Sequence, residues 1–123
     1  GQLDNARATL TWVADNATEA EYRTIARLRL AGVLLDEKKY DEALRQLDAA
    51  NAKEFEALVA DRRGDVLFAQ GKKEEAKAAF TQAWKTMDPG VEYRRLVEAK
   101  LTALGAAPEP DKAQTSPAGV PGR

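Results

Sequence analysis

One stretch decides the fold, and it reads Arg63-Gly64-Asp65-Val66-Leu67-Phe68-Ala69-Gln70-Gly71-Lys72-Lys73-Glu74-Glu75-Ala76-Lys77-Ala78-Ala79-Phe80-Thr81-Gln82-Ala83. Apolar residues recur at helical spacing on both sides of Gly71, and glycine tolerates the left-handed conformation that closes a helix. Large Leu67 and Phe80 stand among small Gly64 and Ala76. The stretch therefore predicts two helices that cross closely at their small residues.

The same pattern occurs a second time, 33 positions earlier in the chain. Four of the matching pairs are Ala31 with Gly64, Leu34 with Leu67, Leu47 with Phe80, and Ala50 with Ala83. A repeat of about 34 residues that forms a helical hairpin is the tetratricopeptide unit, whose consensus this stretch resembles. The resemblance implies a short right-handed solenoid of helical hairpins with a C-terminal capping helix.

Composition independently favours an all-α fold in a single domain. The 123 residues include 24 Ala against one Ile and seven Val, and Ala favours helices whereas β-branched residues favour strands. Six helices are expected, over residues 3–15, 18–37, 41–50, 54–70, 73–87 and 88–105. Thr18 and Glu21 have capping-box spacing, and Asp88-Pro89 suits the start of the last helix.

Missing residue types exclude several function classes. The chain has no Cys and no His, and its net charge is −1. The commonest general base and the thiolate ligands of metals are therefore absent, and mixed charge disfavours a nucleic-acid surface. We expect no catalytic residue, no metal site, no cofactor and no nucleic-acid partner.

The two ends of the chain differ in character. Gly1–Ala6 has the same spacing as Gly71–Ala76, so the sequence is expected to start in mid-repeat, as a fragment of a longer solenoid. Residues 1–105 are expected to form the helical domain, and the Pro-rich segment 106–123 a disordered tail. No run is apolar enough to span a membrane, and the polar start does not resemble a signal peptide.

The architecture offers a concave groove as the candidate binding site, because the first helix of each hairpin lines it. The predicted lining consists of Ile25, Leu28, Gly32, Leu35, Leu58, Asp61, Asp65 and Phe68. It lacks the basic residues with which some tetratricopeptide proteins grip a peptide C-terminus. An alternative is that the last helix, or helices preceding this segment, fill the groove. Rather than an acid/base pair or a cation site, Asp61 and Asp65 are expected to form a solvated acidic face, paired with Arg62 or Arg29.

The two tryptophans are expected to be structural. Trp84 is placed in the core, against the last helix. Trp12 lies beside a face that a preceding helix would cover, so it has the greater chance of being exposed. Together with Leu10 and Val13, it could instead join two copies of the chain.

A narrower resemblance comes from the run Leu58-Val59-Ala60-Asp61-Arg62-Arg63-Gly64-Asp65-Val66-Leu67, taken with Ala26–Ala31 and the closing helix 93–104. Together they resemble the YfgM family of bacterial inner-membrane proteins. The resemblance implies one upstream transmembrane helix and a tetratricopeptide domain on the periplasmic side. It also implies partners, namely the subunits of the SecYEG translocon, periplasmic chaperones or secreted clients.

The sequence thus favours a non-enzymatic protein-interaction scaffold, with location and partners implied by the resemblance alone. Two alternatives stay open. One is a soluble tetratricopeptide adaptor that binds a peptide in another assembly, and the other is a structural homo-oligomer joined through the first helix.

Overall fold

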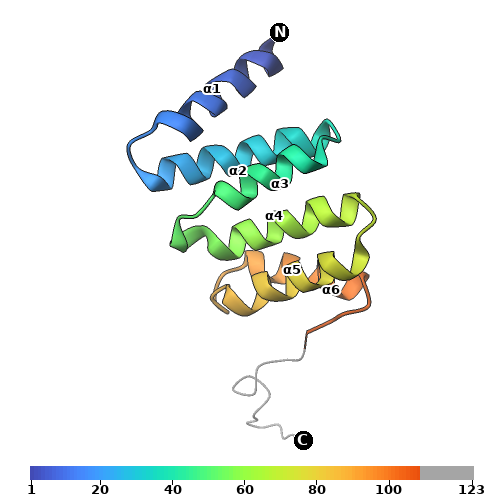
Figure 1. Ribbon diagram of the computed structural model, residues 1–123. Coiled ribbons are helices and arrows are strands. Elements are labelled where there is room, and N and C mark those ends of the chain that lie inside the picture. Colours follow the sequence, from blue (N-terminus) through green and yellow to red (C-terminus); the bar gives the residue numbers. More distant parts are fainter. Residues whose placement is uncertain (109–123) are drawn as a thin grey trace, which may run out of the picture.

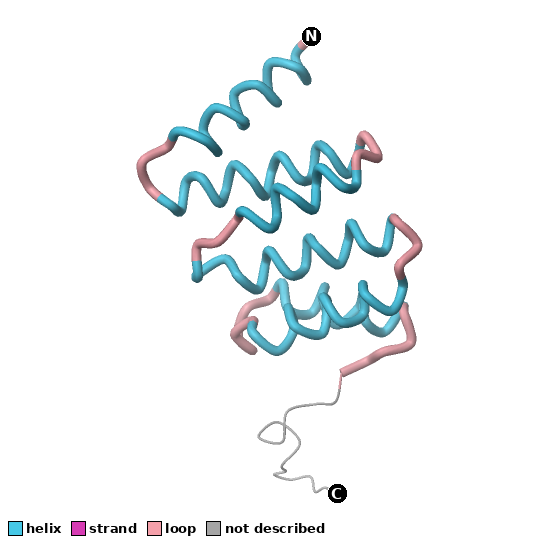
Figure 2. The backbone as a smooth tube through the Cα atoms, in the orientation of Figure 1, coloured by secondary structure: helices cyan, strands magenta, loops and turns pink. Residues whose placement is uncertain are grey.

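The computed structural model describes residues 1–108, with Leu3 described by its backbone alone. The helices are α1 (Gln2–Asn16), α2 (Ala20–Asp36), α3 (Tyr40–Ala49), the 3-10 turn η1 (Lys53–Phe55), α4 (Glu56–Ala69), α5 (Lys73–Thr86) and α6 (Tyr93–Ala103). No strand occurs within this part of the chain (Figure 2). The predicted all-α class is confirmed.

The helices stack into a solenoid (Figure 1). The hairpin of α2 and α3 is followed by the hairpin of α4 and α5. Helices α4 and α5 share the most extensive interface of the fold. At one end of the stack α1 packs on α2, and at the other end α6 packs on α5. The last helix therefore caps the solenoid, as the sequence predicted.

Small residues mark the close helix crossings. The alanines at the predicted crossings are all buried, and they are Ala31, Ala43, Ala50, Ala76 and Ala83. At Gly64 an added Cβ would lie 2.4 Å from the ring of Phe80. Only glycine lets α4 approach the Phe80 ring this closely, which explains the small residue at this position.

Three helices end in the same type of turn. The amide of Lys72 donates to the carbonyl of Leu67 across Gly71, whose φ is +81°. Ala106 donates to Leu101 across Gly105 in the same way. At the end of α2 the left-handed residue is Lys38, with φ +63°. This is the Schellman pattern, which favours glycine at the left-handed position.

Two predicted helix starts are wrong. Helix α2 begins at Ala20, its N-cap residue is Glu19, and no side chain caps it. The expected Thr18 capping box does not form, and the Thr18 carbonyl accepts instead from Arg23 Nη1 at 2.8 Å. Helix α6 begins at Tyr93 rather than at Asp88, because the Asp88 carboxylate accepts from the amide of Gly90 and forms a turn.

The chain after α6 is described only at its start. Ala106 is half-buried against the core, although the disordered tail was expected to begin there. Of that expected tail, residues 109–123 lie outside the described residues.

Candidate functional site

The predicted groove residues divide into an open set and a covered set. Ile25, Leu35 and Leu58 are half-buried, and Phe68 is 55% exposed. Leu28 is only 8% exposed, because it packs in the core cluster that also contains Leu30, Leu34 and Leu47. The partly open side chains Ile25, Leu35, Leu58 and Phe68 come from α2 and α4, the first helices of the two hairpins. We call them the concave set, after the surface that they are predicted to line. Gly32, another residue of the predicted lining, lies on α2 and is half-buried.

Asp61 belongs to the covered set, because α6 brings side chains over it. Tyr93 donates its hydroxyl to Asp61 Oδ2 at 2.6 Å, and Arg62 Nη1 donates to the same oxygen at 2.8 Å. Lys100 Nζ donates to Asp61 Oδ1 at 3.0 Å and to Asp65 Oδ1 at 2.9 Å. We call these five residues the α4–α6 polar cluster. The expected solvated acidic face is therefore wrong for Asp61, whose side chain is 0% exposed.

Electrostatics in the polar cluster favour the protonated forms of its α6 residues. Burial would lower the pKa of Lys100, but its hydrogen bonds and charge attraction to Asp65 and Asp61 outweigh burial and raise the pKa. Burial raises the pKa of Tyr93, and its hydrogen bond to Asp61 raises it further. Burial also raises the pKa of Asp65, despite the opposing effect of Lys100. Because two carboxylates face two cations, the cluster is electrically neutral and fastens α6 to α4.

Sequence reasoning found only part of this cluster. The pairing of Asp61 with Arg62 was among the alternatives considered, and it is confirmed. Tyr93 and Lys100 were missed, since Lys100 stands among the apolar residues Val97 and Leu101 on an otherwise ordinary helix. The two carboxylates four positions apart on α4 were the only signal, and they do not name a partner helix.

Of the two tryptophans expected to be structural, Trp84 is in the core and Trp12 is exposed. The Trp84 side chain is buried against α6, where the Arg94 guanidinium stacks at 3.7 Å from its ring centroid. Arg94 Nε also donates to the Trp84 carbonyl at 2.9 Å. Trp12 is 64% exposed on α1.

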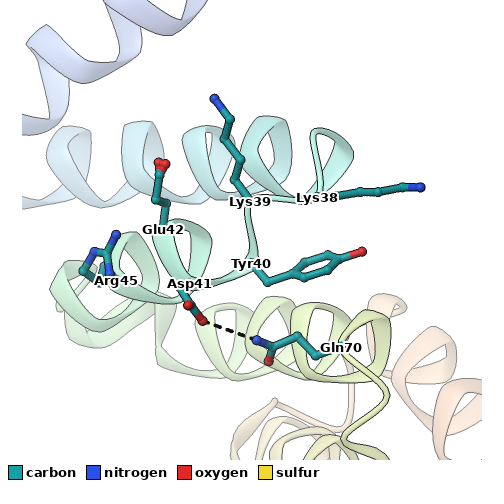
Figure 3. A pocket seen from close by; sticks show the side chains of 7 residues that line it. All are labelled: Lys38, Lys39, Tyr40, Asp41, Glu42, Arg45 and Gln70. Carbon is teal, nitrogen blue, oxygen red and sulfur yellow. Dashed lines mark hydrogen bonds between the residues drawn. The ribbon is translucent and has the colours of Figure 1, made fainter.

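An open hollow of about 490 Å³, lined by mixed charges, lies at the turn between α2 and α3 (Figure 3). Lys38, Lys39 and Arg45 face this region together with Asp41 and Glu42. Gln70 Nε2 donates to Asp41 Oδ1 at 3.5 Å and links α4 to α3 across the hollow. Three basic and two acidic side chains line it, so the charge is mixed with a small positive excess.

Within residues 1–108 no group of three acidic side chains is placed to hold a metal ion. None of the helices in this range has both the length and the apolar character needed to cross a bilayer.

Comparison with known proteins agrees with this architecture. The sequence profile of the tetratricopeptide repeat-like domain family matches residues 1–106. A Neisseria gonorrhoeae protein named ancillary SecYEG translocon subunit is 38% identical over 103 residues, which cover 84% of this chain and 49% of the relative. An Escherichia coli protein of the same name is 32% identical over 85 residues, 69% of this chain and 41% of the relative. No solved structure matches.

The resemblance to the YfgM family is thereby confirmed. The chain spans about half the length of these curated relatives or less.

Proposed function

Because the chain belongs to the family of tetratricopeptide repeat-like domains, we propose that it is a non-enzymatic scaffold that binds other proteins. Its place of action is the SecYEG translocon, after which its relatives are named. In the whole protein an upstream anchor would hold this domain on the periplasmic side of the inner membrane. The translocon subunits would be its first partners, and periplasmic chaperones or secreted clients would be further ones.

The observation that carries this proposal is the concave set. Helical-hairpin solenoids bind partners on their concave surface. We expect Ile25, Leu35, Leu58 and Phe68 to line that surface here, and all four are partly exposed. The neighbouring charges of the polar cluster neutralise one another, so the surface favours an apolar protein segment over a charged tail.

Site-specific photocrosslinking in the full-length protein, in its native membrane, tests the proposal. A photoreactive amino acid replaces Phe68 or Leu35 on the concave surface, and a matched control replaces Ala78, which is exposed on α5. The proposal expects translocon subunits to be trapped from Phe68 and Leu35 but not from Ala78. Equal trapping from all three positions, or none from the concave ones, would contradict it.

A second candidate function, homo-oligomerisation, rests on α1. Trp12 is exposed there, Leu10 and Val13 are only half-buried, and Tyr22 at the start of α2 is also exposed. Exposed apolar side chains of this size can contribute to an interface between two copies of a chain. Sedimentation equilibrium over a range of concentrations tests this candidate, and Trp12→Ser should lower the apparent mass if it is correct. A monomer mass at every concentration would eliminate it for this segment.

A further inference from the structure

A small apolar hollow lies where α4, α5 and α6 meet. Its volume is about 150 Å³, and its lining consists of Asp65, Phe68, Phe80, Lys100, Ala103 and Leu104. Phe68 stands exposed at its rim, whereas Phe80 and Leu104 are buried. Of the concave set, Phe68 alone lines this hollow, whose floor belongs to the core cluster of Phe80 and Leu104.

The side chains that line the hollow cannot easily move to fill it. The Phe80 ring is held against the backbone at Gly64, where even an added Cβ would clash with it. Leu104 belongs to the same buried cluster as Phe80. Because close-packed neighbours hold these walls, the hollow exists before any partner arrives.

Its polar atoms are already paired. Lys100 Nζ bonds to Asp65 and Asp61, and it lies 5.3 Å from the centroid of the Phe80 ring. An acidic group entering the hollow would compete with two carboxylates for this ammonium, and a basic group would meet an ammonium already in place. A neutral apolar group matches the zero net charge of the wall and disrupts neither bond.

The volume of the hollow further limits which group can occupy it. An apolar cavity of this volume accommodates a benzene-sized group, and it is smaller than the pockets that enclose drug-sized ligands. We propose that the hollow is an anchor for a single Leu or Phe side chain of an extended segment of a partner protein. The proposal rests on the proposed function, since it specifies how the concave surface engages its partner. A helix bound in a groove would need several anchors in a row, whereas this hollow offers one.

Peptide binding to the 123-residue chain tests the anchor directly. The probes are a soluble Gly/Ser peptide with one central Phe, and matched peptides with Ser or Glu in its place. Binding is followed by chemical shifts of the methyl and ring groups of Phe68, Phe80, Ala103 and Leu104. The Phe peptide should bind at least about tenfold more tightly than the Ser or Glu peptide, because only its side chain is buried.

Two leucine variants locate the binding. Ala103 lines the hollow, so Ala103→Leu should fill it and weaken the Phe peptide by about tenfold or more. Ala99→Leu adds the same side chain one turn earlier on α6, outside the hollow, and should leave binding unchanged. If Ala103→Leu fails to fold, Phe68→Ser removes the exposed rim instead and should have the same effect. Equal affinities for the three peptides, or equal binding by the Ala103 and Ala99 variants, would overturn the anchor.

The anchor and the proposed function can fail separately. Loss of the anchor, with concave crosslinks to the translocon retained in the full-length protein, would refute the hollow alone. Selective Phe-peptide binding without those crosslinks would support the anchor and refute the translocon as its partner.

Discussion

Lys100 Nζ on α6 lies 3.0 Å from Oδ1 of Asp61 on α4, and the Asp61 side chain has no exposed surface. The same ammonium bonds to Asp65, one helical turn further along α4. Removing one partner of a buried ion pair leaves the other charge uncompensated, which destabilises a fold more than the pair itself stabilises it. We therefore expect the loss of this contact to weaken the packing of the last helix.

Lys100→Met should lower the free energy of unfolding by about 2–4 kcal/mol, because Asp61 keeps only Arg62 and Tyr93 as partners. Urea denaturation followed by circular dichroism measures the change. Lys77→Met is the matched control, since Lys77 pairs with the exposed Glu74, and it should change stability by less than about 0.5 kcal/mol. Equal effects of the two substitutions would show that the buried pair contributes no more to stability than an exposed pair.

Alkaline pH should loosen the same contact. The pKa of Lys100 is raised from 10.5 by its bonds to Asp65 and Asp61, which outweigh burial, and the pKa of Tyr93 is raised from 10.0 by burial and by Asp61. The folded chain thus keeps protons that the unfolded chain has already lost. Stability is full below about pH 10 and falls as pH rises through the folded pKa values.

Urea denaturation at successive alkaline pH values measures this decline. Tyr93→Phe removes one of the two titrating groups, so its stability should fall less steeply over the same range. Identical slopes for the variant and the parent chain would exclude a contribution from Tyr93.

The repeating part of the fold was predictable from sequence because its signals are local. The close approach of α4 to α5 needs a small residue at Gly64 and a large one at Phe80, and the 33-residue offset repeats that pair as Ala31 and Leu47. Gly71 signals its turn directly, since its φ of +81° is one that glycine readily adopts.

The polar cluster could not be predicted in the same way. Whether Asp61 meets water or Lys100 depends on how α6 is set against α4, and no spacing within α4 encodes that placement. The start of α6 was mistaken because Asp88 can cap a helix or close a turn, and Gly90 completes the turn. Leu28 was assigned to the groove, since a small rotation of α2 decides whether it faces the groove or the core.

The two helical glycines should respond oppositely to alanine. Gly64→Ala should destabilise the chain by about 1–3 kcal/mol, because its Cβ would lie within 2.4 Å of the Phe80 ring. Gly32→Ala should stabilise it by up to about 1 kcal/mol, since nothing lies within 4 Å of the added Cβ and Ala favours helix. Thermal and urea unfolding of both variants measure these changes. A neutral Gly64→Ala would mean that the Phe80 ring can move freely out of the way of the added Cβ. In that case, adding Phe80→Leu to Gly64→Ala would restore no stability.

Lys38 occupies the left-handed turn position that Gly71 occupies 33 residues later. A residue with a Cβ is strained there, so Lys38→Gly should stabilise the chain by about 0.5–1 kcal/mol. The reciprocal Gly71→Ala should destabilise it by about 1 kcal/mol. Urea unfolding measures both, and Lys72→Gly, at a residue with negative φ, serves as the control and should not stabilise. A destabilising Lys38→Gly would mean that the lysine side chain contributes more than its backbone strain removes.

Aspartate substitutions separate the concave surface from the core beneath it. Phe68 is 55% exposed, so Phe68→Asp should leave the melting temperature of the chain nearly unchanged. Leu28 is packed with Leu34 and Leu47, so Leu28→Asp places a charge in the core and should lower stability by about 3 kcal/mol or more.

Only the Phe68 variant can therefore report on binding. In the full-length protein, Phe68→Asp should reduce crosslinking from Leu35 to the partner at least severalfold, because a charge at the rim must be desolvated when an apolar segment docks. Arg45→Asp also changes an exposed residue, but it lies on α3 and outside the concave set, so crosslinking should be unaffected. A Phe68→Asp variant that folds normally and captures its partner as well as the parent would place the binding surface elsewhere on the solenoid.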